Sequence, residues 1–207
     1  QDLLCYTSGT NVNDISGNGN AGTFSAATNV SGGYAAFAAL SNITTSTSFN
    51  NPQTFSVSVW LNTTSTTGTK LVGFENVQTG TTSNSYDRQF VVDSTGNLYW
   101  GYYPGAVVIF NYGIVNNGTW YNAAVTFNSG TQVFYLNGAQ VGTSSGGAAQ
   151  NYTGWWRIGG YQATNWNAQT FSGYFTGNIG PFLLHNRVLS NTEITQNFNA
   201  HRGRFGL

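Results

Sequence analysis

Acidic and histidine side chains, the groups that do acid–base chemistry, are scarce in this chain. Among 207 residues there are six Asp and Glu residues and two His residues. Retaining glycoside hydrolysis needs two carboxylates about 5–5.5 Å apart, but Glu75 and Glu193 belong to distant segments. Glu75 and Asp87 could meet across two strands, although solvated loop charges are the commoner state of such residues. His185 and His201 have neither metal-ligand spacing nor a nucleophile motif, so we predict that the protein is not an enzyme.

Aromatic side chains are abundant and offer a different chemistry, the stacking of sugar rings on their faces. The chain has 6 Trp, 12 Tyr and 14 Phe residues. Trp166 is flanked by Asn165 and Asn167, and Tyr86 precedes Asp87 and Arg88. From these patterns we predict a carbohydrate-binding surface made of Tyr86, Asp87, Arg88, Tyr102, Tyr103, Asn165 and Trp166. The alternative for any one of these rings is packing in the interior.

Composition limits the partners of the protein. Charged residues make up 6% of the chain and the formal net charge is zero, so no basic field attracts nucleic acid or an anionic membrane. No run of about 18 apolar residues occurs, so we expect no membrane insertion. A neutral surface does little to prevent association, so permanent protein neighbours are expected. Cys5 is the single cysteine, which excludes an internal disulfide. The chain lacks Met and begins at Gln1, so we interpret it as a processed chain or a segment of a longer protein.

The elements that must position these residues are β-strands. In residues 55–61 apolar residues alternate with Ser56, Ser58 and Trp60, which is the period of a sheet with one buried face. Further strands are predicted in pairs joined by Gly- and Asn-rich turns. These pairs are 88–93 with 98–102, and 120–127 with 131–136, the latter continuing through Asn137 and Gly138 into 139–142.

One helix is predicted, near the C-terminus. Ser190 is a candidate N-cap and Glu193 follows three residues later, which is the pattern of a capping box. Ile194 and Phe198 supply a short apolar face, and Gly203 can end the helix. Many short antiparallel strands with one short C-terminal helix predict an all-β fold, an antiparallel β-sandwich, and no break in composition divides residues 1–207 into more than one domain.

The ordered set of motifs resembles the laminin-G-like branch of the concanavalin A-like lectin/glucanase superfamily. The segments that carry this resemblance are residues 14–23, 55–60, 120–127, 135–138, 158–160, 175–179 and 186–194. The resemblance implies a jelly roll of two large antiparallel sheets. Members of the superfamily bind glycans or proteins, some bind calcium, and some are glycosidases. The hydrolytic members carry a Glu-X-Asp-X-Glu strand, and this chain has no such strand.

The resemblance also makes Asp14 a candidate calcium ligand, because an acidic residue opens the first motif of the family. In calcium-binding relatives a second Asp follows the Gly-X-Ile motif, and here that place is held by Gly180. Calcium prefers several oxygen ligands, charged ones among them. We therefore predict no cofactor, with calcium at Asp14 as the alternative. The other interpretation of Asp14 is a cap on the turn formed by residues 16–20.

The C-terminal segment 196–207 resembles the ends of laminin-G-like domains in structural proteins of tailed phages. It implies a non-catalytic virion structural protein, such as a capsid decoration, tail or fibre component. Such a protein would bind other virion subunits or copies of itself, together with host-surface glycans, and would be found in the virion or outside cells. The alternatives are a secreted carbohydrate-binding lectin module and a degenerate relative of the glycosidases. The tail itself is expected to be either a docking strap or a frayed end.

Overall fold

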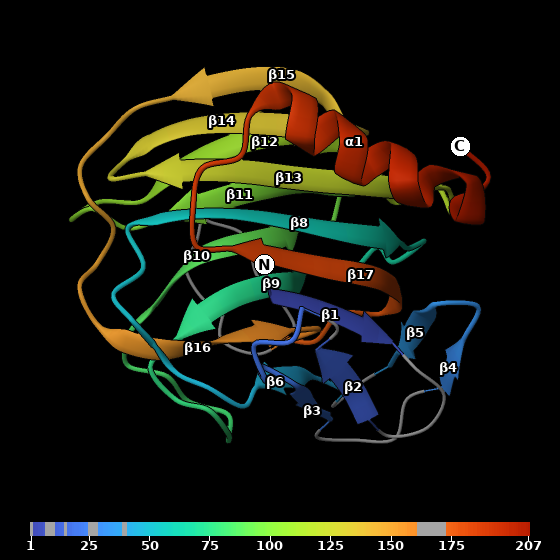
Figure 1. Ribbon diagram of the computed structural model, residues 1–207, viewed down its shortest axis with the longest axis horizontal. Helices are drawn as coiled ribbons and strands as arrows, with labels where there is room; N and C mark the ends of the chain where they lie inside the picture. The colour runs from blue at the N-terminus through green and yellow to red at the C-terminus, as the bar shows by residue number, and fades with distance from the viewer. Residues whose placement is uncertain (1, 7–10, 15, 25–28, 39–40, 161–172) are drawn as a thin grey trace.

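The computed structural model describes residues 2–6, 11–14, 16–24, 29–38, 41–160 and 173–207. Within these ranges the chain forms two antiparallel sheets packed face to face, with one helix near the C-terminus (Figure 1). The predicted β-sandwich with a short C-terminal helix is therefore confirmed. No helix among the described residues has both the length and the apolar character needed to cross a membrane.

The first sheet is built around the long strands in the middle and at the end of the sequence. Its strands, in order of pairing, are β15 (Ala139–Ser144), β14 (Thr131–Leu136), β13 (Trp120–Asn128), β8 (Thr54–Asn62), β17 (Gly177–His185), β1 (Asp2–Tyr6) and β2 (Asn11–Asp14). Strand β17 also pairs with β5 (Tyr34–Phe37), which pairs with β4 (Asn29–Ser31).

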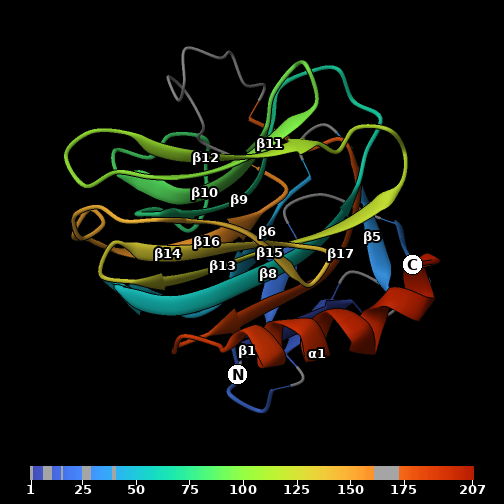
Figure 2. The same cartoon turned by 90° about the horizontal axis from the view of Figure 1, so that it is seen from above.

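The second sheet faces the first and is joined to it through β2. Its strands, in order of pairing, are β12 (Val108–Ile114), β11 (Asn97–Tyr102), β10 (Tyr86–Val92), β9 (Thr69–Glu75), β16 (Thr153–Ile158), β6 (Ile43–Thr45) and β3 (Gly22–Phe24). Strand β3 pairs with β2, and the short β7 (Phe49–Asn50) pairs with β16. Figure 2 shows the two layers from the side, with β10, β11 and β12 in one layer and β8, β13 and β14 in the other.

Alternation along β8 sets which side chains enter the core. Phe55 and Val57 are buried between the sheets and lie opposite Phe127 and Val125 of β13. Trp60 points to the other face, as the alternation predicts, and is covered there by the C-terminal segment. The register between β8 and β13 is fixed because a slip of one residue would move the inward-facing apolar side chains of β8 out of the core.

The helix α1 (Asn191–Arg202) lies on the outer face of the first sheet (Figure 1). Ser190 and Glu193 form the predicted capping box. The Phe198 ring stacks on Trp60 with centroids 5.4 Å apart. Gly203 has right-handed helical geometry, so the chain continues into a 3-10 turn, η1 (Gly203–Phe205), and Gly206 takes the left-handed conformation with φ 76°. Phe205 packs on Trp60 with centroids 4.6 Å apart, so the tail is packed against the sheet at this ring rather than frayed there.

Candidate functional site

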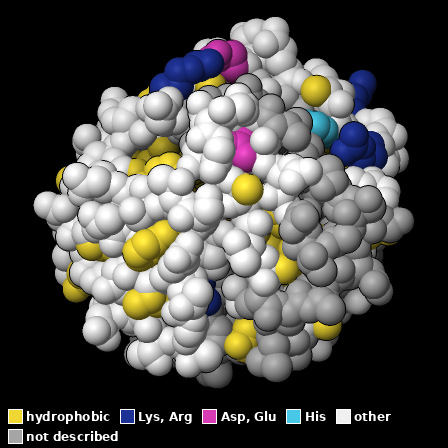
Figure 3. Space-filling model, turned by 60° about the horizontal axis from the view of Figure 1, so that its bottom comes forward, with side chains coloured by type: hydrophobic (Ala, Val, Ile, Leu, Met, Phe, Trp, Pro, Cys, Tyr) yellow, Lys and Arg dark blue, Asp and Glu magenta, His cyan; other side chains and the backbone are white. Residues whose placement is uncertain are grey.

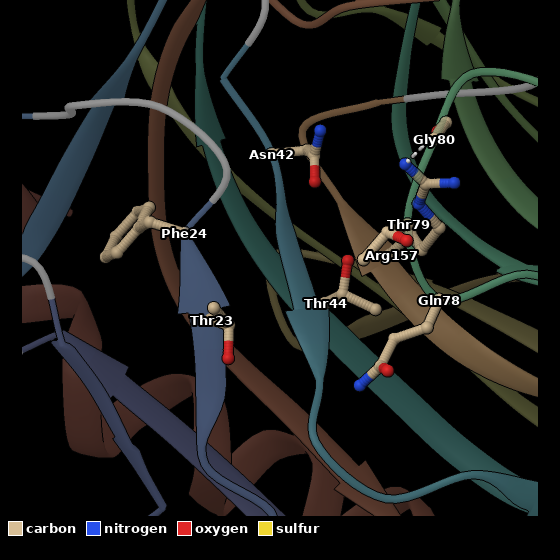
Figure 4. Close-up of a pocket in the computed structure, with 8 residues that line it drawn as sticks. All are labelled: Thr23, Phe24, Asn42, Thr44, Gln78, Thr79, Gly80 and Arg157. Atoms are coloured by element: carbon tan, nitrogen blue, oxygen red, sulfur yellow. Dashed lines mark hydrogen bonds between the residues drawn. The ribbon is translucent and has the colours of Figure 1, made fainter.

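A pocket of about 250 Å³ opens on the outer face of the second sheet, where β3, β6 and β16 lie side by side. The register places Thr23 beside Thr44 and Thr44 beside Arg157. Ile43 and Trp156, the neighbours of these residues in sequence, are buried in the core, so Thr44 and Arg157 must face outward. In Figure 4 the three side chains form a row. The residues that line the pocket are Thr23, Phe24, Asn42, Thr44, Gln78, Thr79, Gly80 and Arg157.

The loop between β9 and β10 forms the remaining wall of the pocket. The Gln78 side-chain amide donates a hydrogen bond to the Thr45 carbonyl over 3.2 Å. Arg157 Nη2 donates to the Gly80 carbonyl over 3.0 Å. The loop is therefore tied to both β6 and β16, and these ties hold its pocket-lining residues in place.

A cluster of charged side chains adjoins the pocket through Arg157. Arg157 Nη1 contacts Glu75 Oε2 at 3.1 Å, and the Lys70 ammonium contacts the other Glu75 oxygen. The Ser83 hydroxyl donates to the same carboxylate. A Cβ atom on Gly73 would collide with the end of the Lys70 side chain, so glycine at this position leaves the space that the lysine occupies.

The pKa values of this cluster reflect burial opposed by charge pairing. Burial by itself raises the pKa of Glu75, but Lys70, Arg157 and the hydrogen bonds outweigh it, so the pKa lies below its ordinary value. Burial lowers the pKa of Lys70, and Glu75 opposes that change. The basic side chains and the Ser83 hydroxyl around Glu75 therefore favour its ionised form.

Burial of charge is general in this protein and corrects one expectation from the sequence. Six of the charged residues whose burial the structure describes are buried. These are Lys70, Glu75, Asp87, Arg88, Asp93 and Arg157. Glu75 and Asp87 were expected as solvated loop charges, and that expectation is wrong because both lie in strands covered by other parts of the chain.

Asp87 and Arg88, predicted to contact a sugar, lie inside the protein. Arg88 Nη1 contacts Asp87 Oδ1 at 2.6 Å, and the Tyr152 hydroxyl donates to the same oxygen over 2.9 Å. The Arg88 guanidinium also lies 5.0 Å from the centre of the Phe74 ring. Burial raises the pKa of Asp87, with Arg88 opposing. Both side chains are fully enclosed, so their placement on an accessible binding surface is corrected.

The predicted aromatic residues differ in how far they are buried. Tyr102 is fully buried against Phe127, with ring centroids 5.1 Å apart, so its predicted place on the carbohydrate-binding surface is also corrected. Tyr86 is half-buried beside Val91, and Tyr103 is exposed. Trp166 and Asn165 lie outside the described residues. Sugar contact by Tyr86, Tyr103, Asn165 and Trp166 stays a prediction.

Asp14 holds the turn that follows it. Its two carboxylate oxygens accept hydrogen bonds from the backbone N–H groups of Ser16, over 2.8 Å, and Asn20, over 2.7 Å. A Cβ atom on Gly180 would lie 2.8 Å from the Trp60 Cβ, so this position has no room for a second carboxylate. Within the described ranges no three His, Cys, Asp or Glu side chains are grouped to hold a metal. Calcium at Asp14 stays a prediction.

A second surface is defined by the absence of charge. From Ser94 to Trp156 the sequence contains no charged residue and no histidine. This span holds β11 to β15, and within the described residues β12 and β15 each pair on one side only. Figure 2 shows these strands in opposite layers, and the Phe110 ring fills the space beside Gly142. We call this surface the uncharged edge. Its exposed apolar side chains are Val107, Ile109, Ile114 and Val141.

Sequence reasoning missed the pocket because threonine, asparagine and glutamine are common throughout this chain. One signal was present. Arg157 stands between Trp156 and Ile158 in a strand, and a charge between two core residues must lie on the outer face of its sheet. On the face shown in Figure 3 charged side chains are few, so a buried arginine at a pocket is distinctive here.

Comparison with known proteins identifies the fold. Residues 31–195 match a family model described as the concanavalin A-like lectin/glucanases superfamily. No curated protein sequence matches the chain.

Solved structures with the same fold include binding domains of botulinum neurotoxins. One is the receptor-binding domain of the mosaic serotype C/D, with a TM-score of 0.69 at 14% identity, covering 96% of this chain and 50% of that chain. Another is the serotype G binding domain, with a TM-score of 0.64 at 16% identity, covering 97% of this chain and 50% of that chain. The chain thus spans about half the length of these domains, and at such low identity the likeness shows the fold alone.

Proposed function

The chain belongs to the concanavalin A-like lectin/glucanase superfamily, and from this premise we propose that it is a non-catalytic binding module of a virion. In this proposal the uncharged edge joins the module to other virion subunits or to copies of itself, and the pocket takes a host-surface glycan. The burial of Glu75 and Asp87 supports a role without catalysis, because neither carboxylate can reach a substrate. The virion setting is supported by the resemblance of the C-terminal segment to phage structural proteins.

The uncharged edge is the observation that carries the assembly role. Exposed edge strands offer unpaired backbone groups to another strand, and proteins commonly block them with charged side chains or proline. Neither β12 nor β15 contains a charged residue or proline. Ile114 at the end of β12 is 61% exposed, and exposed apolar patches mark interaction sites. A partner strand without charges could therefore pair with β12 or β15 without burying a charged side chain of either strand.

Binding to a protein partner agrees with one of the structural neighbours. That neighbour is a botulinum neurotoxin binding domain solved in complex with synaptotagmin II, so a domain of this fold presents a surface to another protein. We infer the same general use of the fold for this chain, with the uncharged edge as the surface.

Sedimentation velocity tests the assembly role. We expect the wild-type protein to associate and Ile109→Lys to sediment as a monomer, because a lysine on β12 would be buried without a partner in the interface. Val188→Lys is the matched control, since Val188 is also exposed but lies in the segment before α1. Co-sedimentation of the wild type with virus particles tests the virion setting. A wild-type protein that stays monomeric and never sediments with particles contradicts the proposal.

The second candidate function is that of a secreted carbohydrate-binding lectin, and the pocket is the observation that favours it. The Thr23, Thr44 and Gln78 side chains offer hydroxyl and amide groups, and Phe24 offers a ring. A glycan array would identify the sugar. A hit lost in Thr44→Val but kept in Trp166→Ala assigns binding to the pocket, whereas the reverse assigns it to the aromatic residues predicted from the sequence.

A further inference from the structure

The chain enters β12 through an unbroken apolar stretch. Residues 106–110 read Ala-Val-Val-Ile-Phe, without charge, proline or glycine. β-branched and aromatic residues favour strands, and short uncharged segments of this kind pair readily with other strands when they lie at the edge of a sheet. The charged residues nearest in sequence are Asp93 and Arg157, so no charge flanks the stretch to oppose such pairing.

The core of the protein is partly open at β12. Val108 and Phe110 pack against the core, but both remain partly accessible. Ile109 and Asn111 alternate with them and are exposed on the outer face of the sheet. Within the described residues β12 pairs with β11 alone, so its other side offers backbone N–H and C=O groups. A strand added there would also cover side chains on both faces of the sheet.

The regular part of β12 coincides with its apolar part. Residues 108–111 lie in unbroken register opposite residues 99–102 of β11. The register of this pair shifts only after Asn111, where Tyr112 is the extra residue. The bulge therefore leaves residues 108–111 straight enough to pair on their free side.

The other edge strand of the uncharged edge, β15, is less open. Its register with β14 shifts between Phe134 and Tyr135, which leaves Val141 as an extra residue within the strand. A bulge of this kind bends an edge strand and hinders further pairing. Helix α1 also begins beside β15 (Figure 1), where the Asn191 side-chain amide donates a hydrogen bond to the Gln140 side chain over 3.2 Å.

The chemistry of β12 suits a second copy of the same strand. When two identical edge strands pair antiparallel, a two-fold axis relates them, and each residue meets a residue of the same short segment. A charged segment would bring like charges together, which is destabilising. Strand β12 has no charge with which to repel its copy. Its β-branched and aromatic side chains instead form the cross-strand pairs that stabilise a sheet.

We propose that two copies of this chain associate through antiparallel pairing of their β12 strands, centred on residues 109–111. The second sheets of the two copies then form one continuous sheet. The inference rests on the assembly role proposed above and names both the strand and the partner. A two-fold contact uses the same strand of each copy, so the association closes at a dimer.

Sedimentation velocity of the purified chain at increasing concentration tests whether the partner is a copy. We expect an equilibrium between monomer and dimer without larger species. A chain that stays monomeric alone but sediments with virus particles overturns this inference and leaves the assembly role intact. A chain that stays monomeric and binds no particle contradicts both. Larger, open-ended species overturn the closed two-fold contact.

Two charge substitutions test which edge strand forms the contact. Ile109→Lys lies on β12 and Thr143→Lys lies on β15, and both native side chains are exposed. We expect Ile109→Lys to weaken dimerisation about tenfold or more, because the two-fold axis brings two ammonium groups close together. Thr143→Lys should dimerise like the wild type. Equal dimerisation of the two variants, or a loss in Thr143→Lys alone, overturns the assignment to β12.

Cysteine cross-linking keeps the test decisive if Ile109→Lys does not fold. The variants carry Cys5→Ala, since Cys5 is the single native cysteine. Residues that lie opposite each other in antiparallel strands have Cβ atoms about 4.5–5.5 Å apart, within reach of a short thiol cross-linker. Ile109→Cys should cross-link to its own copy if the axis passes at residue 109, and Asn111→Cys if it passes at residue 111. Only a mixture of the two should cross-link if the axis passes at Phe110.

We expect a covalent dimer in at least one of these three samples. Thr143→Cys is the matched control on β15, and it should remain monomeric under the same conditions. A covalent dimer of Thr143→Cys, with none in the three β12 samples, would place the contact on the other edge strand. Absence of a covalent dimer from all four samples overturns the pairing of β12.

Discussion

Around β9 and β16 the protein buries Lys70, Glu75 and Arg157 next to a polar pocket, whereas the uncharged edge exposes Ile109, Ile114 and other apolar side chains. This is the reverse of the usual distribution, in which charges lie outside and apolar residues inside. The burial of charged side chains and the exposure of apolar ones each cost free energy in the isolated chain. In a protein with so few charges, the burial of charge at one place and its absence at another therefore give two surfaces of different chemistry.

The largest effect should come from breaking the buried cluster. Glu75→Gln leaves Lys70 and Arg157 enclosed without a counter-charge, and we expect it to lower the free energy of unfolding by about 3–5 kcal/mol. Urea denaturation measures the loss. Combining Glu75→Gln with Lys70→Met should recover part of it, because one unpaired cation is then removed. A stability equal to that of the wild type would show that the cluster tolerates an unpaired charge.

A smaller loss of stability is expected from a substitution at Gly142, where Phe110 of the uncharged edge packs. A Cβ atom at Gly142 would collide with the Phe110 ring, which stacks on Phe134 with centroids 4.0 Å apart. Gly142→Ala should therefore cost about 1–3 kcal/mol by overpacking. Gly203→Ala is the control, since open space surrounds that position and its φ of −61° suits any residue. Equal melting temperatures in the two variants would disprove the close packing of Phe110.

The exposed ion pair between Arg187 and Glu193 can be compared with the buried pairs of Glu75. Arg187 and the capping-box hydrogen bonds lower the pKa of Glu193 from 4.5 to about 2. A carboxylate with a depressed pKa stabilises the fold above its unfolded pKa, so this contribution should be complete above pH 4.5 and lost as the pH falls towards about 2. The stability difference between wild type and Glu193→Gln, followed by urea denaturation across this range, should vanish at the acid end. A constant difference would contradict the assignment.

Calcium should have the smallest effect. Both oxygens of Asp14 already accept backbone hydrogen bonds, and position 180 has no room for a second carboxylate. We expect the same melting temperature with millimolar calcium and with a chelator. A bound ion at 100 times its Kd would add about 2.7 kcal/mol, so a rise that disappears in Asp14→Ala would establish the metal site instead.

Much of the fold could be predicted from the sequence because the signals for it are local. The alternation in residues 55–61 fixed which side of β8 enters the core, and it placed Trp60 on the opposite face. Ser190 and Glu193 identified the start of α1, since a capping box needs only a few neighbouring residues.

The same reasoning failed at Asp87 and Arg88 because the strand is irregular there. Arg88 has a φ of 52°, and the register between β10 and β9 shifts between Asp87 and Phe90. A bulge breaks the period of two on which a prediction of inside and outside depends. Both side chains are consequently buried. The hydroxyl of Tyr152, which is distant in sequence, donates a hydrogen bond to Asp87, and the Arg88 guanidinium lies over the Tyr152 ring.

Many of the strands, the capped helix and the scarcity of charge can thus be inferred from local patterns of residues. The burial of the charged side chains and the residues that form the pocket depend on the three-dimensional fold. Thr23, Thr44 and Arg157 come from three distant segments, and only the pairing of β3, β6 and β16 brings them into one row. The packing of the whole core decides which distant strands pair, and no local pattern of residues encodes that choice.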